Sequence, residues 1–369
     1  MARLLLISMG QLTGTVLEAV ARRGGFAEIV VASRNPAAAE RKLNNARIGA
    51  AIEGQFPLMR AVGLDFNETA TAARVLAEIR PDIAFAAPSL MPWWRIDELV
   101  AAGRKELAAV PFAGWLACHL APMLALARAW AASGLACPWI GASYPDVVNA
   151  VLHRHRGQGP ISGAGNIEEA VPKLRFVAAE AMGADPAELE IWLVAQHALE
   201  YFLYAPEEPA DRPPCMLRVL WRGRDISAEV ERRLFRPMPI PYDLDFNRLT
   251  GSAASLLLEA LTGEVPKRLH VPAPMGLVGG YPVLAAAGRI DLDLPADWTL
   301  AAARACNEAS LAWDGIAAID ADGTVRYTDR TAAALRSLLG EAVASLRPDA
   351  APALAGRLLS ALGVARGMG

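Results

Sequence analysis

The segment S-M-G-Q-L-T-G, residues 8–14, has the composition of a turn that binds phosphate. It follows a short apolar run and precedes a helical pattern. The start of a helix offers free N–H groups and a dipole to the pyrophosphate of a dinucleotide. A full dinucleotide motif reads G-x-G-x-x-G. Only Gly10 is in register here, because Ser8 and Thr13 occupy the other two positions and Gly14 comes one residue late. The segment alone predicts a dinucleotide site weakly, and a tight turn without a ligand is the alternative.

The residues after the second apolar run, Ser33-Arg34-Asn35, indicate which dinucleotide would bind. A site for NAD usually has an acidic residue here, which binds the ribose 2′-hydroxyl. A carboxylate would repel a 2′-phosphate, whereas Arg34 can pair with one, assisted by Arg41 or Lys42. We therefore predict NADP rather than NAD. The alternative is that Arg34 is an ordinary solvated loop residue.

Alternating strand and helix patterns must position these residues. Apolar runs predict strands at residues 3–7, 28–33, 59–66 and 82–88, with helical periodicity between them. This order, β-α-β-α-β-α-β with short connections, predicts an α/β fold with a Rossmann-type doubly wound parallel sheet. A further strand is expected at residues 135–143. The predicted cofactor-binding residues lie at the ends of these strands: Ser8, Gly10, Gln11, Leu12, Ser33, Arg34, Pro88 and Ser143.

The alternation of predicted strands and helices ends near residue 160, and the predicted elements after it follow no regular order. We expect a dinucleotide-binding Rossmann domain at residues 1–160 and a catalytic or substrate domain at residues 161–369. The last part of the chain predicts a helix, a hairpin with an Asp322-Gly323 turn, and a final helix.

Residues 141–197 contain short motifs in a fixed order: Ser143-Tyr144-Pro145, Ser162-Gly163-Ala164-Gly165-Asn166, Ala179-Glu180 with Gly183 and Pro186, and Gln196-His197-Ala198. This series resembles the lactate/malate dehydrogenase superfamily. There S-N-P ends a strand, I-G-x-G-T-x-L-D-x-x-R opens a helix that ends in A-E-x-L-G-x-x-P, and a strand leads to G-x-H-G. The N-terminal units and the segments 248–261 and 270–283 resemble the family too. The resemblance implies a divergent, NADP-type member, with an α+β catalytic domain of that type.

The resemblance implies that His197 is the acid/base residue of a dehydrogenase. Reducing a carbonyl needs a hydride and a proton for the new alkoxide, and a His with a pKa near neutrality suits the proton transfer. A carboxylate holds such a His in one tautomer. Glu168 and Glu169 stand in the position of the family Asp, and either one is expected to be the partner of His197.

The expected substrate residues depart from the family pattern. The family Arg that clamps the substrate carboxylate is matched by Lys173, which is a point charge and not a planar fork. The family Asn after the strand-end Ser is replaced by Tyr144, which indicates a bulkier or aromatic pocket. Thr250 matches the substrate-facing Thr, with an ordinary helix residue as the alternative. Lys173 and Tyr144 together disfavour pyruvate and oxaloacetate as substrates.

The region after the fourth strand has an Arg in this family that polarises the carbonyl, and Arg95 is the best match. Trp93 and Trp94 precede it, and packing is the favoured interpretation for this pair. The stretch 105–135 is longer than the family pattern and strongly apolar. It is expected to be a buried or interface helix, and His119 within it is expected to be structural. An enlarged homodimer or homotetramer interface is plausible for such a surface.

Composition excludes several function classes. The charge is 36 basic minus 39 acidic side chains, or −3, which gives no basic face for nucleic acid. The hydrophobic content of 54% excludes a disordered chain. The four cysteines form no CxxC pair, and His153-x-His155 lacks a third ligand, so no metal site is expected. A short apolar run at the N-terminus predicts a strand and not a signal peptide, so we expect no membrane association and a cytoplasmic protein.

These observations predict an NADP-dependent oxidoreductase that interconverts a ketone and its secondary alcohol, with His197 as the acid/base. The expected substrate is a small carbonyl or hydroxy compound that resembles a 2-oxo acid or has another acidic group. One alternative is an opine-type dehydrogenase acting on C–N bonds. Another is a regulatory or scaffold protein that binds a dinucleotide with altered catalysis.

Overall fold

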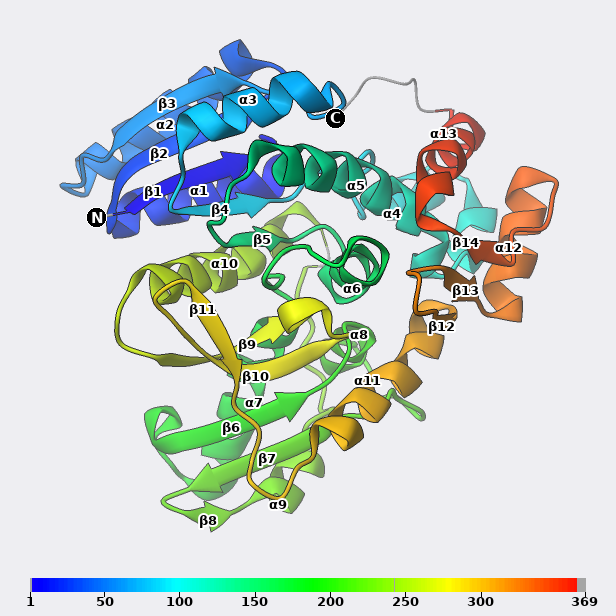
Figure 1. The fold of residues 1–369 in the computed structure, drawn as a ribbon. Helices are drawn as coiled ribbons and strands as arrows, with labels where there is room; N and C mark the ends of the chain where they lie inside the picture. Colours follow the sequence, from blue (N-terminus) through cyan, green and yellow to red (C-terminus); the bar gives the residue numbers. More distant parts are fainter. Residues whose placement is uncertain (1, 242, 364–369) are drawn as a thin grey trace.

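A five-stranded parallel sheet forms the first part of the structure. The computed structural model describes residues 2–241 and 243–363 (Figure 1). The strand order is β3-β2-β1-β4-β5, and every neighbouring pair is parallel. This confirms the predicted Rossmann-type sheet. The strands are β1 (Ala2–Ile7), β2 (Phe26–Ser33), β3 (Leu58–Gly63), β4 (Ile83–Ala86) and β5 (Trp139–Gly141).

The sheet is buried on both faces, as the unbroken apolar runs predict. Side chains alternate along a strand, so Leu4 and Leu6 of β1 face one core while Leu5 and Ile7 face the other. The first core includes helices α1, α2 and α10, and the second includes α3, α5 and α6. These helices are α1 (Gln11–Arg23), α2 (Pro36–Ile52), α3 (Thr69–Ile79), α5 (Leu116–Ser133), α6 (Pro145–Arg156) and α10 (Asn247–Thr262).

The strand order reverses between β1 and β4, because β2 and β3 lie on one side of β1 and β4 and β5 on the other. In an open parallel sheet, ligands bind at the carboxyl ends of the strands at such a point. Residues that follow β1, β4 and β5 therefore meet at one edge. The short helix α4 (Arg95–Ala101) lies in the connection between β4 and α5.

The second part is antiparallel and α+β, as expected. One sheet has the order β6-β7-β8 and another the order β11-β10-β9, and a bridge between Ala195 and Gly280 links the two. Helix α7 packs against β6 and β9. The elements are α7 (Ile167–Met182), β6 (Leu189–Val194), α8 (Ala198–Leu203), β7 (Met216–Trp221), β8 (Arg224–Asp225), α9 (Ser227–Glu231), β9 (Lys267–Pro272), β10 (Gly280–Ala286), β11 (Arg289–Leu292) and α11 (Leu300–Asp314).

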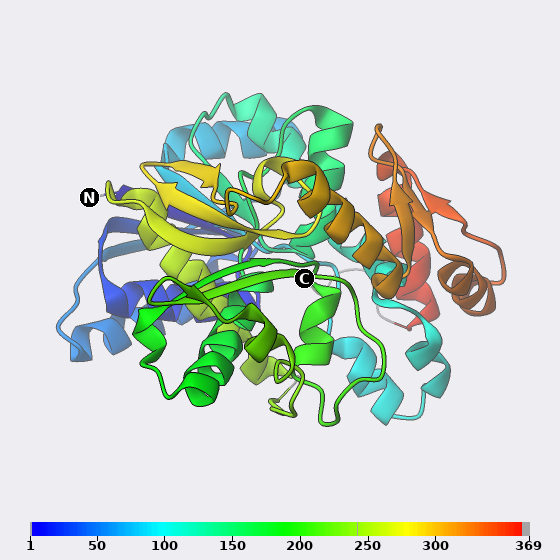
Figure 2. The ribbon, with the colours of Figure 1, turned by 90° about the horizontal axis from the view of Figure 1, so that it is seen from below.

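The C-terminal elements form a separate layer on one side of the molecule (Figures 1 and 2). Strands β12 and β13 make the predicted hairpin, but two helices follow it where one was expected. Helix α13 packs on α5 of the first part, so this layer shares the core beneath α5. The division at residue 160 stays a prediction. The elements are β12 (Ile316–Ile319), β13 (Val325–Tyr327), α12 (Asp329–Leu339), β14 (Ser345–Leu346) and α13 (Ala351–Ala361).

One helical stretch among the described residues, Phe112–Ser133, is long and apolar enough to cross a membrane. Its most apolar window is 83% buried inside the protein. It packs between α3, α6 and α13 of the same chain. This is the packing of a core helix, so the apolar stretch is covered by the chain itself.

Candidate active site

Two cavities meet at the carboxyl edge of the parallel sheet. One, here called the Arg34 cavity, has a volume of about 440 Å³ and lies beyond β1 and β2. The other, the His197 cavity, has about 300 Å³ and lies between the two parts of the chain. Ser8, Gly10, Ser89 and Leu90 line both, so the two cavities adjoin at these residues. An extended ligand that occupied both would pass beside them.

The start of helix α1 lies where the two cavities join. Gly10 precedes the helix and supplies no capping side chain, and Gln11, Leu12 and Thr13 of the first turn line the His197 cavity. The backbone N–H groups of a first turn have no partner within the helix, so they are available to an anion. A Cβ built on Gly10 would find no atom within 4 Å. The residues present thus fit a pyrophosphate at this turn.

The Arg34 cavity has a basic lining. Arg34, Lys42 and Arg128 line it, and none of its described lining residues is Asp or Glu. Lys42 Nζ donates to the Met9 carbonyl at 3.2 Å, which fixes its amine beside the turn. The ribose 2′-phosphate of NADP is bound by cationic side chains, whereas the ribose 2′-hydroxyl of NAD is typically bound by a carboxylate. The lining therefore fits a 2′-phosphate.

The structure brings the eight predicted cofactor-binding residues to these two cavities. Five line the His197 cavity or both cavities, and three line the Arg34 cavity alone. The Ser143 hydroxyl donates to the Pro88 carbonyl at 2.6 Å, which ties the end of β5 to the end of β4. The eight are Ser8, Gly10, Gln11, Leu12, Ser143, Ser33, Arg34 and Pro88.

His197 lines its cavity and pairs with Asp314. His197 Nδ1 lies 3.1 Å from Asp314 Oδ2; the Asp314 side chain is buried and that of His197 is 11% exposed. The Asp314 carboxylate also accepts from the Tyr144 hydroxyl at 2.8 Å and from Gln196 Nε2 at 2.6 Å. Helix α11 ends at Asp314 because Gly315 follows with a φ of 95°. The left-handed conformation of Gly315 turns the chain and leaves Asp314 at the helix end facing His197.

This pairing corrects the prediction that Glu168 or Glu169 is the partner of His197. Glu168 Oε2 accepts from the His270 backbone N–H at 2.6 Å, beside β9. Glu169 is buried beneath the cavity and lies against Glu200 and Thr250. The family position does place Glu169 near His197, but its carboxyl group turns towards α8. Sequence spacing gives a residue's position on the helix and not the direction of its side chain.

The electrostatics favour a charged His197. Burial lowers the pKa of His197, but the Asp314, Asp146 and Glu169 carboxylates outweigh it and raise the pKa above the usual value. Burial opposes ionisation of Asp314, yet His197 and the three hydrogen bonds lower the pKa of this carboxyl. The His197 backbone N–H donates to Asp146 Oδ1 at 3.2 Å. Burial raises the pKa of Asp146 to about 6.

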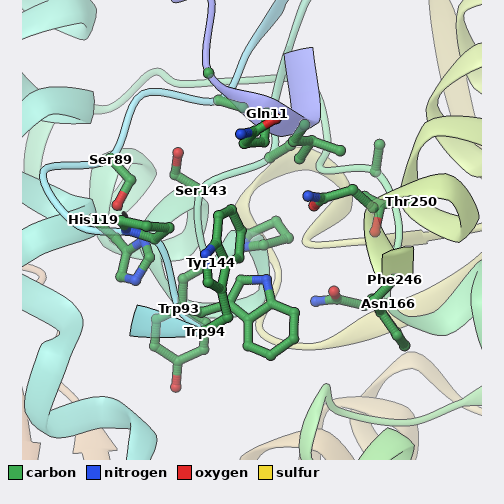
Figure 3. A pocket seen from close by; sticks show the side chains of 18 of the residues that line it. Gln11, Ser89, Trp93, Trp94, His119, Ser143, Tyr144, Asn166, Phe246 and Thr250 are labelled. Carbon is green, nitrogen blue, oxygen red and sulfur yellow. Dashed lines mark hydrogen bonds between the residues drawn. The ribbon is translucent and has the colours of Figure 1, made fainter. Parts of the chain in front are cut away.

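The predicted substrate residues divide into two groups. Tyr144 and Thr250 line the His197 cavity (Figure 3). Lys173 does not, because its Nζ donates to the Leu203 carbonyl and, at 2.8 Å, to the Arg236 carbonyl. Arg95 is half-exposed at the start of α4 and forms an ion pair with Glu98 at 2.8 Å. This corrects the placement of Lys173 and Arg95 at the substrate.

His119 lines the His197 cavity, although sequence reasoning gave it a structural role. Its Nδ1 lies 3.3 Å from Ser89 Oγ, and its buried Nε2 has no partner among the described residues. The Ser89 hydroxyl donates to the Met91 carbonyl, so the Ser89 oxygen accepts from His119 Nδ1–H. Nε2 is then an acceptor. Burial, aided by His197, lowers the pKa of His119 to about 4, so the ring is neutral.

Sequence reasoning missed Asp146, Glu200 and Asp314 as members of this site. Asp146 follows the Tyr144-Pro145 turn, and a carboxylate in the first turn of an otherwise apolar helix was an available signal. Asp314 precedes a glycine at a predicted helix end, which is also common in solvated turns. Among residues 2–241 and 243–363, no group of three or more His, Cys, Asp or Glu side chains is placed to hold a metal ion.

No protein-family model matches the sequence, and no curated protein sequence matches it. Solved structures are similar in fold. A lactate dehydrogenase from a Medee basin deep-sea metagenome library covers 85% of this chain and 96% of its own, with a TM-score of 0.55 and 12% identity. A malate dehydrogenase from Salinibacter ruber covers 85% of this chain and 95% of its own, with a TM-score of 0.53 and 15% identity. A lactate dehydrogenase from Eimeria maxima, solved with NADH and oxamate, covers 84% of this chain and 92% of its own, with a TM-score of 0.50 and 11% identity. The resemblance seen in residues 141–197 is thus confirmed in three dimensions, and the chain has the fold of the lactate and malate dehydrogenases.

Proposed function

We propose that this protein is an NADP-dependent oxidoreductase that interconverts a ketone and its secondary alcohol. The observation that carries the proposal is the His197–Asp314 pair, in which His197 lines a cavity that the turn before α1 also lines. A protonated His beside a dinucleotide site is the group that a carbonyl reduction needs. The fold shared with lactate and malate dehydrogenases supports the same reaction class.

NADP(H) is the cofactor that the lining supports best. The Eimeria maxima relative was solved with NADH, which supports a nicotinamide dinucleotide here. Arg34 and Lys42, with no acidic residue among the described lining, favour the phosphorylated form, while the Arg128 guanidinium pairs with Asp349 at 2.9 Å. When bound, the nicotinamide supplies or accepts the hydride. Its ring would lie in the His197 cavity, with the 2′-phosphate in the Arg34 cavity.

The chain's own residues handle the proton. In reduction, His197 donates a proton to the oxygen of the new alcohol, and in oxidation it takes the proton back. Asp314 holds the ring through Nδ1 and stabilises the imidazolium, and Tyr144 and Gln196 fix Asp314 in turn. Trp93 and Trp94 line the cavity mouth and help to exclude water. His197 also polarises the substrate carbonyl, which was the role expected of Arg95.

The expected acidic group on the substrate finds no cationic partner here. None of the described residues that line the His197 cavity is Lys or Arg. The proposal is therefore limited to a ketone and its alcohol as a small-molecule pair. A homodimer or homotetramer, a cytoplasmic location, and the absence of nucleic-acid and membrane partners remain part of the proposal.

Turnover of NADPH tests the function. The wild-type protein is mixed with NADPH and a panel of ketones that differ in size and charge, and loss of NADPH absorbance is followed with product analysis. We expect at least one secondary alcohol to form. His197→Asn should lower kcat by about 10²–10⁴-fold while NADPH affinity is unchanged.

Other results would contradict the proposal in distinguishable ways. If only mixtures of a ketone and an amine consume NADPH, and a secondary amine forms, the reaction is the opine type. If NADPH binds but no compound is reduced, and a cellular effect survives in His197→Ala, the protein is a dinucleotide-binding regulator or scaffold. Full activity in His197→Asn would place the acid elsewhere.

A further inference from the structure

The wall of the His197 cavity has acceptors and no fixed cation. Among the described lining residues, His197 is the one basic group with a raised pKa, and Asp314 neutralises it. The two cations expected here point elsewhere, since Lys173 binds two backbone carbonyls and Arg95 pairs with Glu98. A substrate carboxylate would therefore meet no Lys or Arg side chain in this cavity, and its desolvation is costly.

Two buried glutamates lie at the His197 cavity, and one of them, Glu169, is one turn before Lys173 on α7. Glu200 of α8 lines the cavity and Glu169 of α7 lies directly behind it, and both are buried. Glu200 Oε1 has no hydrogen-bond partner among the described residues, whereas the Glu169 carboxyl group lies against the Glu200 and Thr250 side chains and the Asn166 backbone. A Cβ on Gly165 would lie 2.7 Å from Glu169 Oε1 and 2.7 Å from Thr250 Cγ2, so these groups meet at one point.

Each of the two carboxyl groups affects the ionisation of the other. Burial raises the pKa of Glu169 and, more strongly, that of Glu200, whose pKa is raised further by the neighbouring Glu169 carboxylate. A cation placed beside both carboxyl groups would relieve this repulsion. No ion pair joins either glutamate to a Lys, Arg or His within the described chain.

A second observation in this cavity, at His119, is compatible with the same ligand. His119 is 5% exposed, lines the cavity, and its Nε2 is an unpartnered acceptor. Aromatic side chains also line the cavity: Trp93 packs edge-on against Trp94, with ring centroids 5.7 Å apart, and against Phe246 at 6.1 Å (Figure 3). Aromatic faces attract cations. Of the unpartnered polar atoms on residues that line this cavity, His119 Nε2 and Glu200 Oε1 can accept a hydrogen bond, and the Thr13 hydroxyl can donate or accept one.

We propose, resting on the function above, that the substrate has a protonated amine and that the Glu169–Glu200 pair binds it. An ammonium group has three hydrogen-bond donors and a positive charge, which match the acceptor oxygens of the two carboxyl groups. The site would thus bind a cation with carboxyl groups, where the family pattern binds a carboxylate with an Arg. Thr250 positions Glu169 beside that group. The cavity accordingly selects amino ketones and amino alcohols against 2-oxo acids.

Three aromatic ketones of similar shape test this charge preference. They are 4-(aminomethyl)acetophenone, 4-ethylacetophenone and 4-acetylbenzoate, which are cationic, neutral and anionic near pH 7. Each is titrated calorimetrically into the protein saturated with NADPH. We expect the ammonium compound to bind about tenfold or more tightly than the carboxylate, with the neutral compound between them.

Charge-neutral variants identify the group responsible. The double variant Glu169→Gln/Glu200→Gln removes both carboxyl groups with little change in shape and should abolish the preference, whereas Glu200→Gln alone leaves the Glu169 carboxylate and should weaken it. Glu180→Gln, on the exposed face of the same helix α7, is the control and should retain it. Thermal melting and NADPH binding of each variant show that it is folded.

The outcomes separate this inference from the proposed function. Failure of NADPH to bind the wild-type protein overturns both. If NADPH binds but the carboxylate binds as tightly as the ammonium compound, only the amine inference fails. It also fails if none of the three probes binds the NADPH complex, or if the folded glutamine variants keep the preference.

Discussion

His197 Nδ1 lies 3.1 Å from Asp314 Oδ2, although the two residues are 117 positions apart in the sequence. One follows β6 and the other ends α11, so the pair forms only when the antiparallel sheets and the last long helix are in place. Since the carboxylate sets the tautomer, His197 Nε2 is the nitrogen left to face the substrate. The His197–Asp314 pair therefore determines the expected proton transfer, its pH dependence and part of the pH dependence of stability.

Asp314→Asn should disable proton transfer without preventing cofactor binding. The amide cannot stabilise the imidazolium and can hold the ring in the wrong tautomer, so kcat should fall by about 10²-fold or more. Steady-state kinetics with NADPH measure the effect. Asp291→Asn, at an exposed position on β11, is the matched control. Equal kcat values for the two variants would show that Asp314 has no part in the proton transfer.

The pH dependence of the two reaction directions should be opposite. Reduction needs protonated His197, so its rate falls as pH rises through the pKa of His197, which lies above the usual value near 6.5. Oxidation needs the neutral ring and becomes faster over the same range. In Asp314→Asn the main favourable carboxylate is gone while burial stays, so both profiles should move to lower pH. Unshifted profiles would assign the titration to another group.

The same pair should stabilise the fold over a defined pH range. The folded pKa of His197 is raised, so the contribution is fully present below the unfolded pKa and is lost as pH rises through the folded value. Denaturant unfolding of wild-type and Asp314→Asn proteins at several pH values measures it. The difference in unfolding free energy should shrink as the medium becomes alkaline. A difference that grows with pH would contradict the pairing.

Gly10→Val should block the dinucleotide while leaving the fold intact. The backbone at Gly10 has a φ of −74°, which any residue adopts, and no atom lies within 4 Å of a Cβ there. The new side chain would therefore fill cavity space and not clash with protein. NADPH affinity should fall by about tenfold or more, with an unchanged melting temperature. Gly14→Ala, inside α1, should bind NADPH normally, and equal affinities for both variants would place the cofactor elsewhere.

Lys173→Met should affect stability and not substrate binding. One buried hydrogen bond to the Leu203 carbonyl and one partly buried hydrogen bond to the Arg236 carbonyl are lost, which costs about 1–3 kcal/mol of unfolding free energy. Chemical denaturation measures the loss, and Lys105→Met at an exposed position is the control. A rise in KM with unchanged stability would instead restore Lys173 to the substrate site.

The strands and helices of the first part follow closely from sequence because their signals are local. A buried parallel strand needs an unbroken apolar run, and Leu4 to Ile7 supply one. The turn residues were predictable too, since Ser8, Ser33 and Ser143 end strands that must share an edge. Tyr144 and Thr250 were found through the family resemblance, which fixes the order of segments along the chain.

The charged groups of the site were harder to predict, because a carboxylate's partner depends on side-chain direction and on elements distant in sequence. Glu169 stands in the position of the family Asp, but its carboxyl group faces Glu200. The partner of His197 is instead Asp314, the last residue of α11, which lies far along the chain from the recognised motifs. Lys173 and Arg95 matched the family by position alone, and the backbone carbonyls and Glu98 bind them instead. Position on an element was predictable, and the hydrogen-bond network was not.

Calorimetric titration with NADPH and NADH tests the central claim most directly. The account predicts that NADPH binds about tenfold or more tightly than NADH, and that Arg34→Asp removes this preference by setting a carboxylate against the 2′-phosphate. Arg41→Asp makes the same charge change at a residue outside the cavity lining and should keep the preference. Tighter binding of NADH, or an unaltered preference in Arg34→Asp, would contradict the phosphate site. Binding of neither dinucleotide would contradict the proposed function as a whole.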